Sequence, residues 1–394
     1  MSKTDYSRQP RGDNHLGAVL VPDIQEKSAV AVEDRRIDKR SMEYVVRSGL
    51  AGGVAGSAAK TLIAPLDRVK ILFQTSNPHY KKYRGSFRGM FRAVNHIYSN
   101  DGVRGLYQGH SATLLRIFPY AAIKFVCYEQ IRTVLIPDNN HETAARRLLA
   151  GSLAGVASVF CTYPLDLIRV RLAFQTHHSA PGSPAHTKGQ FGHLLRQIYN
   201  EQPRFTFNTG GELQNELWIT RTVYRALGKN LGVFQSLTNF YRGFAPTILG
   251  MVPYAGVSFY THDLIHDIFR SPVWSQYTVK GSPEVLASCL TSTHSHDKRP
   301  PLKTWAQLLA GGSAGMLAQA AAYPFEVIRR RMQVGGVVNA GGQFYSITKI
   351  TRIIYAESGL KGFYVGLGIG FIKVVPMFAC SFYVYERCKT MLNI

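Results

Sequence analysis

Six charged residues that could form ion pairs occur in one motif that is repeated three times along the chain. In each copy a proline is followed by an acid two positions later and by a base five positions later. The copies are Pro65-Leu66-Asp67 with Lys70, Pro164-Leu165-Asp166 with Arg169, and Pro324-Phe325-Glu326 with Arg329. An isolated i,i+3 pair stabilises a helix by only about 0.2–0.5 kcal/mol. Three copies beside helix-bending prolines instead predict that three helix ends converge and that their charges form a ring.

A second triplet of prolines marks another helix in each repeat. Pro119, Pro253 and Pro376 each follow an aromatic-x-Gly element. These elements are Tyr107-Gln108-Gly109, Tyr241-Arg242-Gly243 and Tyr364-Val365-Gly366. The repeating unit is therefore a helix, a loop and a second helix. The two prolines of the middle repeat are 89 residues apart, against 54 and 52 in the others, so this repeat holds an insertion at about residues 176–239.

Six segments that are nearly free of charge predict membrane-spanning helices, because about 20 mostly apolar residues are needed to cross the hydrocarbon core. The segments are 48–66, 111–128, 148–165, 244–261, 304–325 and 366–384. The alternative is the buried helical core of a soluble protein, but six such segments are rare in that class. An even number of spans places both termini on the same side of the membrane.

Composition favours an anionic partner and argues against several other classes of protein. Lys and Arg exceed Asp and Glu by 22, which favours nucleic acid, phospholipid head groups or a phosphorylated substrate. The charge is spread along the chain without a nucleic-acid-binding signature, so a basic nucleic-acid-binding protein is the remote alternative. Five cysteines without a CxxC pair predict neither a metal site nor a disulfide framework. The chain lacks nucleophile-elbow, P-loop and zinc-protease motifs, so we expect no enzyme activity and no cofactor.

These patterns divide the chain into five parts. They are a polar, disordered N-terminal tail (1–43), repeat 1 (44–135), repeat 2 (144–270, with the insertion at 176–239), a polar loop (271–300) and repeat 3 (301–394). The tail interleaves acids with bases and is therefore unlike a cleavable presequence.

From about Tyr44 to Ile394 the chain resembles the mitochondrial carrier family, in which Pro-x-acid-x-x-base is followed by acid-Gly and aromatic-base-Gly elements. Repeat 1 has Asp101-Gly102, repeat 3 has Ser358-Gly359, and repeat 2 has Gln235-Ser236 where acid-Gly is expected. The resemblance implies an all-α membrane protein with six transmembrane helices in three tandem two-helix repeats. Short matrix helices join them, and the whole forms a pseudo-threefold barrel around a central cavity. It also implies a monomer in the mitochondrial inner membrane with both termini on the intermembrane-space side.

The resemblance further implies a gate at each end of the cavity. At the matrix gate Asp67 pairs with Arg169, Asp166 with Arg329, and Glu326 with Lys70, while Gln74 and Gln333 are expected to brace the ring by hydrogen bonds. The cytoplasmic gate comprises Tyr128, Glu129 and Arg132, then Asp263 and His266, then Tyr385, Glu386 and Lys389. Because His266 replaces a full-time base and is expected to face Glu129, we predict that this gate is the weaker one.

Positions that differ between the repeats predict the ligand contacts. Arg116, Gly250 and Lys373 occupy equivalent positions, and with Lys60 and Lys124 the two cations form a basic lining suited to a polyanion. Tyr120 and Tyr254 offer rings for stacking on a base. Gly250, followed by Met251, either leaves room for a flat group or packs helices tightly.

Free N–H groups at helix starts predict a phosphate cradle after Gly109, Gly243 and Gly366, and the resemblance implies cardiolipin as the ligand. The segments around Lys60, Arg116 and Gly250 are most similar to the coenzyme A carrier branch of the family, near the Graves' disease carrier. That similarity implies transport of coenzyme A by alternating access, in exchange for an adenine nucleotide. The alternative is a carrier for another nucleotide, such as ATP-Mg in exchange for phosphate, or ADP.

Overall fold

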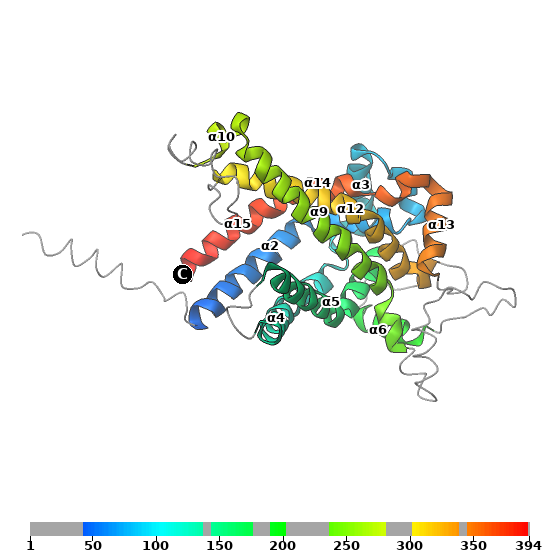
Figure 1. The fold of residues 1–394 in the computed structure, drawn as a ribbon. Coiled ribbons are helices and arrows are strands. Elements are labelled where there is room, and N and C mark those ends of the chain that lie inside the picture. The colour runs from blue at the N-terminus through cyan, green and yellow to red at the C-terminus, as the bar shows by residue number, and fades with distance from the viewer. Residues whose placement is uncertain are drawn as a thin grey trace, which may run out of the picture.

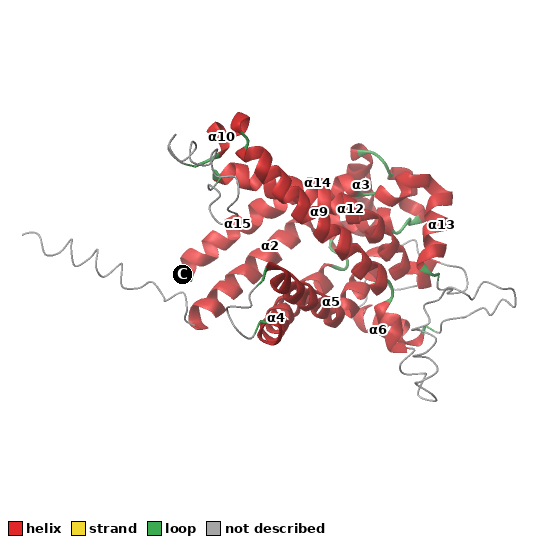
Figure 2. Ribbon diagram, viewed as in Figure 1, coloured by secondary structure: helices red, strands yellow, loops and turns green. Residues whose placement is uncertain are grey.

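The computed structural model describes residues 42–136, 143–175, 190–201, 236–280, 302–338 and 345–392. The predicted tail up to residue 41 and most of both predicted insertions lie outside these residues. Within the described ranges the chain forms helices and one isolated antiparallel bridge, between Val279 and Leu302 (Figure 2). The all-α prediction is therefore confirmed.

Each of the six predicted charge-poor segments falls within a long helical stretch. These stretches are α2 (Met42–Gln74), α4 (His110–Leu135), α5 (Ala144–Phe174), α9 (Phe244–Arg270), α12 (Thr304–Val338) and α14 (Leu367–Ile372) with α15 (Val374–Met391). The last stretch is divided at Lys373, three residues before Pro376, which cannot donate a backbone hydrogen bond. By length and composition alone, two parts of the described chain are apolar enough to cross a membrane, Arg146–Phe174 and Ile347–Met391.

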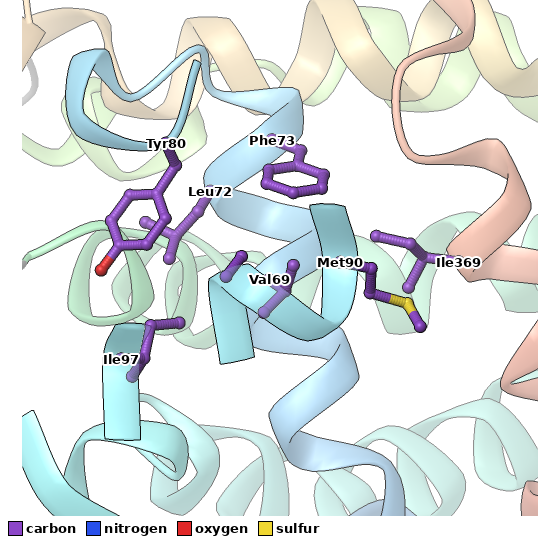
Figure 3. Close-up of a cluster of buried hydrophobic side chains, with 8 residues drawn as sticks. Val69, Leu72, Phe73, Tyr80, Met90, Ile97 and Ile369 are labelled. Carbon is purple, nitrogen blue, oxygen red and sulfur yellow. The ribbon is translucent and has the colours of Figure 1, made fainter. Parts of the chain in front are cut away.

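A short helix follows the first long helix of each repeat and packs against it through an apolar face. The short helices are α3 (Phe87–Leu106), α6 (Gln190–Asn200) and α13 (Ile347–Ser358). In repeat 1, Met90, Ala93 and Ile97 of α3 recur at helical spacing and bury themselves against Val69 and Leu72 of α2 (Figure 3). Equivalent clusters join α6 to α5 and α13 to α12. Each fully buried aliphatic side chain stabilises this packing by about 1.5–3 kcal/mol.

The long helices close into a ring. The most extensive contacts between elements are those of α4 with α5, α9 with α12, and α15 with α2, so the second helix of each repeat packs on the first helix of the next. Figure 1 shows α15, the last helix, lying beside α2, the first. Arg47 Nη1 donates to the Leu392 carbonyl at 3.0 Å, so the start of α2 and the end of α15 lie at the same end of the ring, which we call the terminal mouth.

Candidate functional site

The structure contains all three ion pairs that the family resemblance implies for the repeated motif. Arg169 Nη2 lies 2.9 Å from Asp67 Oδ2, Arg329 Nη2 lies 2.6 Å from Asp166 Oδ2, and Lys70 Nζ lies 2.9 Å from Glu326 Oε1. The pairs link α2 to α5, α5 to α12, and α12 to α2 in turn. We call these six residues the charged ring.

The charged ring is largely removed from solvent. Asp67, Lys70 and Asp166 have 8, 5 and 2% of their surface exposed. At about 4 Å and an effective dielectric constant near 20, one such pair gains roughly 4 kcal/mol, and desolvation of the two ions cancels much of that gain. The net bond is weak enough to break during a conformational change, whereas removing one partner leaves an unpaired buried charge.

Two glutamines brace the ring through tyrosine hydroxyls. Gln74 Nε2 donates to Tyr323 Oη at 3.0 Å, and Gln333 Nε2 donates to Tyr163 Oη at 3.1 Å. The hydroxyls donate in turn to backbone carbonyls of the aromatic-x-Gly elements, Tyr323 to Val365 at 2.9 Å and Tyr163 to Arg242 at 2.6 Å. Sequence reasoning missed both tyrosines, although each directly precedes the motif proline in its repeat.

The junction between α2 and α5 lacks this brace. The position of the tyrosine is held by Ala64 and that of the glutamine by Ala173. Both alanines line a narrow cavity of about 20 Å³, together with Asp67 and Arg169. The Asp67–Arg169 pair therefore holds its junction without the glutamine–tyrosine contact found at the other two.

Three further cations contact the carboxylates of the ring. Lys373 Nζ lies 2.7 Å from Asp67 Oδ1, Arg116 Nη1 lies 2.8 Å from Asp166 Oδ1, and Arg330 Nη1 lies 3.1 Å from Asp166 Oδ2. Arg330 was not singled out from the sequence, because it directly follows the motif base and has no equivalent in the predicted pairing. Among the described residues, six cations thus contact the three ring acids, which leaves an excess of three positive charges.

A cavity of about 340 Å³ opens beside the ring. It is lined by Lys60, Lys70, Tyr254, Gln319, Ala322, Glu326, Lys373, Val374 and Met377. Three of these, Lys60, Tyr254 and Lys373, were predicted as ligand contacts, and Gln319 was not. Lys60 Nζ lies 3.6 Å from the Met377 sulfur, a weak acceptor that leaves its ammonium group without a paired anion.

The remaining predicted ligand contacts do not line this cavity. Arg116 lies over the ring of Tyr120, with 5.3 Å between the guanidinium carbon and the ring centroid. Lys124 is exposed, and Met251 follows Gly250 on α9. A Cβ added to Gly250 would lie 3.0 Å from Phe325 Cβ on α12, so of the two interpretations of this glycine the structure favours tight helix packing.

Glycines begin the second helix of each repeat in a left-handed conformation. Gly109, Gly243 and Gly366 have φ angles of 86°, 80° and 85°, which L side chains rarely adopt. A Cβ at Gly109 would lie 2.8 Å from the Arg169 carbonyl oxygen, and one at Gly243 would lie 3.1 Å from that of Arg329. These glycines therefore bring the helix starts against the backbone that carries the ring bases.

The acid of the acid-Gly element in repeat 2 is Glu201, not a residue near Gln235-Ser236. Glu201 directly follows α6, as Asp101 follows Asn100 of α3. It pairs with Arg171 at 2.5 Å and with Arg242 at 3.2 Å, whereas Asp101 pairs with Arg68 at 3.3 Å. The insertion of repeat 2 lies after this acid in the sequence, which is why alignment from the aromatic-x-Gly side misplaced it.

At the terminal mouth one predicted pair of the second network is not formed. Glu129 and His266, both in the described part of the chain, form no ion pair with each other. His266 instead stacks on His262 of the same helix with 4.1 Å between ring centroids. His262 Nδ1 lies 3.6 Å from Asp263 Oδ1, and Tyr385 Oη lies 3.3 Å from Ser48 Oγ. Ion pairs thus join the helices at the charged ring while this pair at the terminal mouth is open.

Comparisons with known proteins agree with the repeat structure. The family model described as mitochondrial carrier protein matches residues 41–139, 140–272 and 300–394. The chain is 53% identical over 355 residues to mitochondrial carrier protein LEU5 of Saccharomyces cerevisiae, covering 89% of this chain and 92% of that protein. It is 37% identical to human solute carrier family 25 member 16 (89% and 90% covered) and 33% identical to mitochondrial carrier protein CoAc2 of Zea mays (90% and 88% covered).

We predict that supplying the missing brace stabilises the closed ring. The double substitution Ala64→Tyr with Ala173→Gln should add a hydrogen bond at the α2–α5 junction and raise the stability of this conformation by about 0.5–1.5 kcal/mol. Thermal unfolding of the purified protein would measure the change. Ala64→Phe with Ala173→Gln is the matched control, since it fills the cavity without a hydroxyl. Equal stabilisation by both variants would show that packing, and not the brace, accounts for the effect.

Proposed function

We propose that this chain, which belongs to the mitochondrial carrier family and is a multi-pass transporter of the mitochondrial inner membrane, carries coenzyme A or a closely related adenine nucleotide. It works as a monomer by alternating access, in exchange for a second adenine nucleotide. Another nucleotide carrier, for ATP-Mg and phosphate or for ADP, is the second candidate. Both candidates place a polyanion with an aromatic base in the cavity beside the charged ring.

The observation that carries the proposal is the excess of positive charge beside the cavity. Six cations contact the three ring acids, and two of them, Lys70 and Lys373, line the cavity together with Lys60. A buried excess of this size is costly until an anion neutralises it. Coenzyme A and ATP each carry several phosphate charges on one adenosine and fit this requirement, whereas a neutral or singly charged metabolite does not.

Arg116 and Lys373 connect the bound substrate to the ring. Each already contacts a ring acid, Arg116 at Asp166 and Lys373 at Asp67. A phosphate that binds either cation competes with that carboxylate, so substrate binding withdraws a partner from the ring. Asp166 would still have Arg329 and Arg330, but Asp67 would have only Arg169. The free energy of substrate binding is in this way used to loosen the ring at its unbraced α2–α5 junction.

Aromatic side chains favour a nucleotide over inorganic phosphate. Tyr254 lines the cavity with 47% of its surface exposed, and Tyr120 lies beneath Arg116. An adenine ring that stacks on an exposed tyrosine buries apolar surface on both partners. Gly250 adds no such contact, because the side on which a Cβ would stand packs against Phe325.

The family orientation would place the charged ring on the matrix side and the terminal mouth on the cytoplasmic side. The ring pairs are then the matrix gate, which is closed in this conformation, and the residues around Glu129, His266 and Tyr385 belong to the cytoplasmic gate. Both termini would lie in the intermembrane space, in line with the contact between Arg47 and Leu392.

Cardiolipin is the proposed lipid partner at the helix starts. A cavity of about 370 Å³ lies between the start of α3 and the start of α14, and Arg84, Ser86, Lys361 and Gly366 are among its lining residues. Burial lowers the pKa of Arg84 to about 10, so its guanidinium remains charged at neutral pH. Two basic side chains and two helix starts can hold a phosphate group there.

We predict that Arg116→Ala and Lys373→Ala each reduce coenzyme A uptake into proteoliposomes by about 10- to 100-fold, because one charged hydrogen bond to a phosphate is lost. Uptake of coenzyme A, dephospho-coenzyme A, ATP, ADP and adenosine 3′,5′-bisphosphate would be compared. Lys349→Ala, which removes an exposed charge outside the cavity, is the control. Normal uptake by a folded variant would remove that residue from the site, and the absence of uptake by wild type would refute the substrate.

Removal of cardiolipin should lower the unfolding temperature of the purified carrier, and adding it back should restore the original value. Lys361→Gln should shrink the shift, since it removes one of the cations that line the cavity at the start of α14. Phosphatidylcholine serves as the control lipid. An unfolding temperature that does not depend on cardiolipin would rule out this role.

We predict that His266→Lys slows uptake into vesicles that lack internal coenzyme A. A permanent cation facing Glu129 would strengthen closure of the cytoplasmic side and favour the matrix-open state. In wild type the same pair forms only when His266 is protonated. Burial and the adjacent His262 lower the pKa of His266 below the ordinary histidine value in this conformation, so closure should strengthen as the pH falls to and below about 6.5. Identical rates and pH profiles for the variant and wild type, in vesicles of known orientation, would contradict the pairing.

A further inference from the structure

The polar loop that follows repeat 2 begins with a short helix whose exposed face is apolar. This helix, α10 (Pro272–Thr278), starts after an extended residue, Ser271, at the end of α9. Val273, Trp274 and Tyr277 have 71, 50 and 61% of their surface exposed. Ser275 and Thr278 form the buried side, and Gln276 is the exposed polar residue. A helix facing water would expose polar side chains where α10 exposes valine, tryptophan and tyrosine.

Hydrogen bonds fix α10 against the ends of two long helices. Thr278 Oγ1 donates to the carbonyls of Phe269, at the end of α9, and of Trp274. Lys303 N donates to the Thr278 carbonyl at 2.6 Å, and Val279 forms the antiparallel bridge with Leu302. The helix therefore has a fixed position between the end of α9 and the start of α12, as Figure 1 shows for α10 and α9.

More aromatic and basic residues continue the exposed face. Trp305, in the first turn of α12, is 46% exposed and its ring lies 6.5 Å from that of Phe269. Lys280 is exposed directly after α10, and Lys303 precedes α12. Tryptophan and tyrosine at the ends of spanning helices characteristically occupy the layer of lipid head groups. Lysines beside them attract anionic head groups electrostatically.

We propose that α10 with Trp305 forms an anchor that lies in the head-group layer of the membrane, where Lys280 and Lys303 bind anionic phospholipid. The exposed apolar side chains are then covered by the boundary between acyl chains and head groups. Because α10 is hydrogen-bonded to both α9 and the start of α12, the anchor also holds the junction between repeats 2 and 3 at a fixed depth. The first part of the polar loop thus has a structural use independent of the substrate.

Tryptophan quenching by brominated lipids tests the anchor on the full-length chain. The sequence has three tryptophans, so Trp218→Phe with Trp305→Phe leaves Trp274 as the single reporter. In proteoliposomes its emission should shift to shorter wavelength than in water, and lipids brominated near the head group should quench it more than lipids brominated near the chain end. The control has all three tryptophans replaced by Phe and carries Gln276→Trp, which places the reporter on the polar side of α10. Equal quenching of the two reporters would overturn the proposal.

A second arm tests the choice of head group. Vesicles would contain phosphatidylcholine and phosphatidylglycerol, with bromine on only one of the two lipids. At low ionic strength the lysines should enrich the anionic lipid near Trp274 by about fivefold each, and Lys280→Gln with Lys303→Gln should abolish that preference. Quenching that does not distinguish the two lipids would overturn the anionic site. Neither arm depends on transport, so failure of the anchor and failure of the proposed substrate are separate results.

Discussion

The arrangement of this carrier depends on burying three carboxylates among more cations than they can neutralise. Asp67, Asp166 and Glu326 hold the first helices of the three repeats together at one end. Every other structural feature of that end serves to bring these charges within contact distance. A proline lies within each first helix, where it removes one backbone hydrogen bond. The glycine starts let the second helices approach the ring, and the short helices fix the orientation of each first helix by apolar packing.

Threefold repetition gives the ring its geometry. The positions at which the three repeats differ make the junctions unequal, and an unequal ring can favour one orientation of a ligand. A symmetric ring would have three equal junctions and no preferred ligand orientation. Among the described residues Asp166 forms ion pairs with three arginines, whereas Glu326 forms one, with Lys70, and two junctions carry a glutamine–tyrosine brace that the third lacks. The junctions therefore differ in strength, and Lys60 and Lys373, which are not matched by a cation in every repeat, line the cavity.

The sequence was sufficient for the features that recur and insufficient for those that depend on distant neighbours. Repetition predicted the helix pairs and a ring of charges, because equivalent residues must occupy equivalent places, and the family resemblance supplied the three pairings within the ring. Repetition did not predict Arg330, because the equivalent positions of the other two repeats hold no base. Tyr163 and Tyr323 were visible beside the prolines, but their partners belong to other repeats. Glu201 was missed because the insertion separates it from the aromatic-x-Gly element, and the direction that Gly250 faces can be read only from the packing of α9 on α12.

Because Arg116 and Lys373 contact ring acids, the proposed binding site and the ring would form one electrostatic system. If the cations of the cavity were separate from the ring, a bound anion would gain affinity without altering the closed state, and binding alone would produce no movement. Because each of these cations is already a partner of a ring acid, a phosphate can bind it fully only by weakening that contact. The contact most exposed to this competition is the one at Asp67, where Lys373 lies at the break between α14 and α15 and the neighbouring junction has no brace. Opening should therefore begin between α2 and α5, because this junction has the fewest interactions to break when the substrate binds.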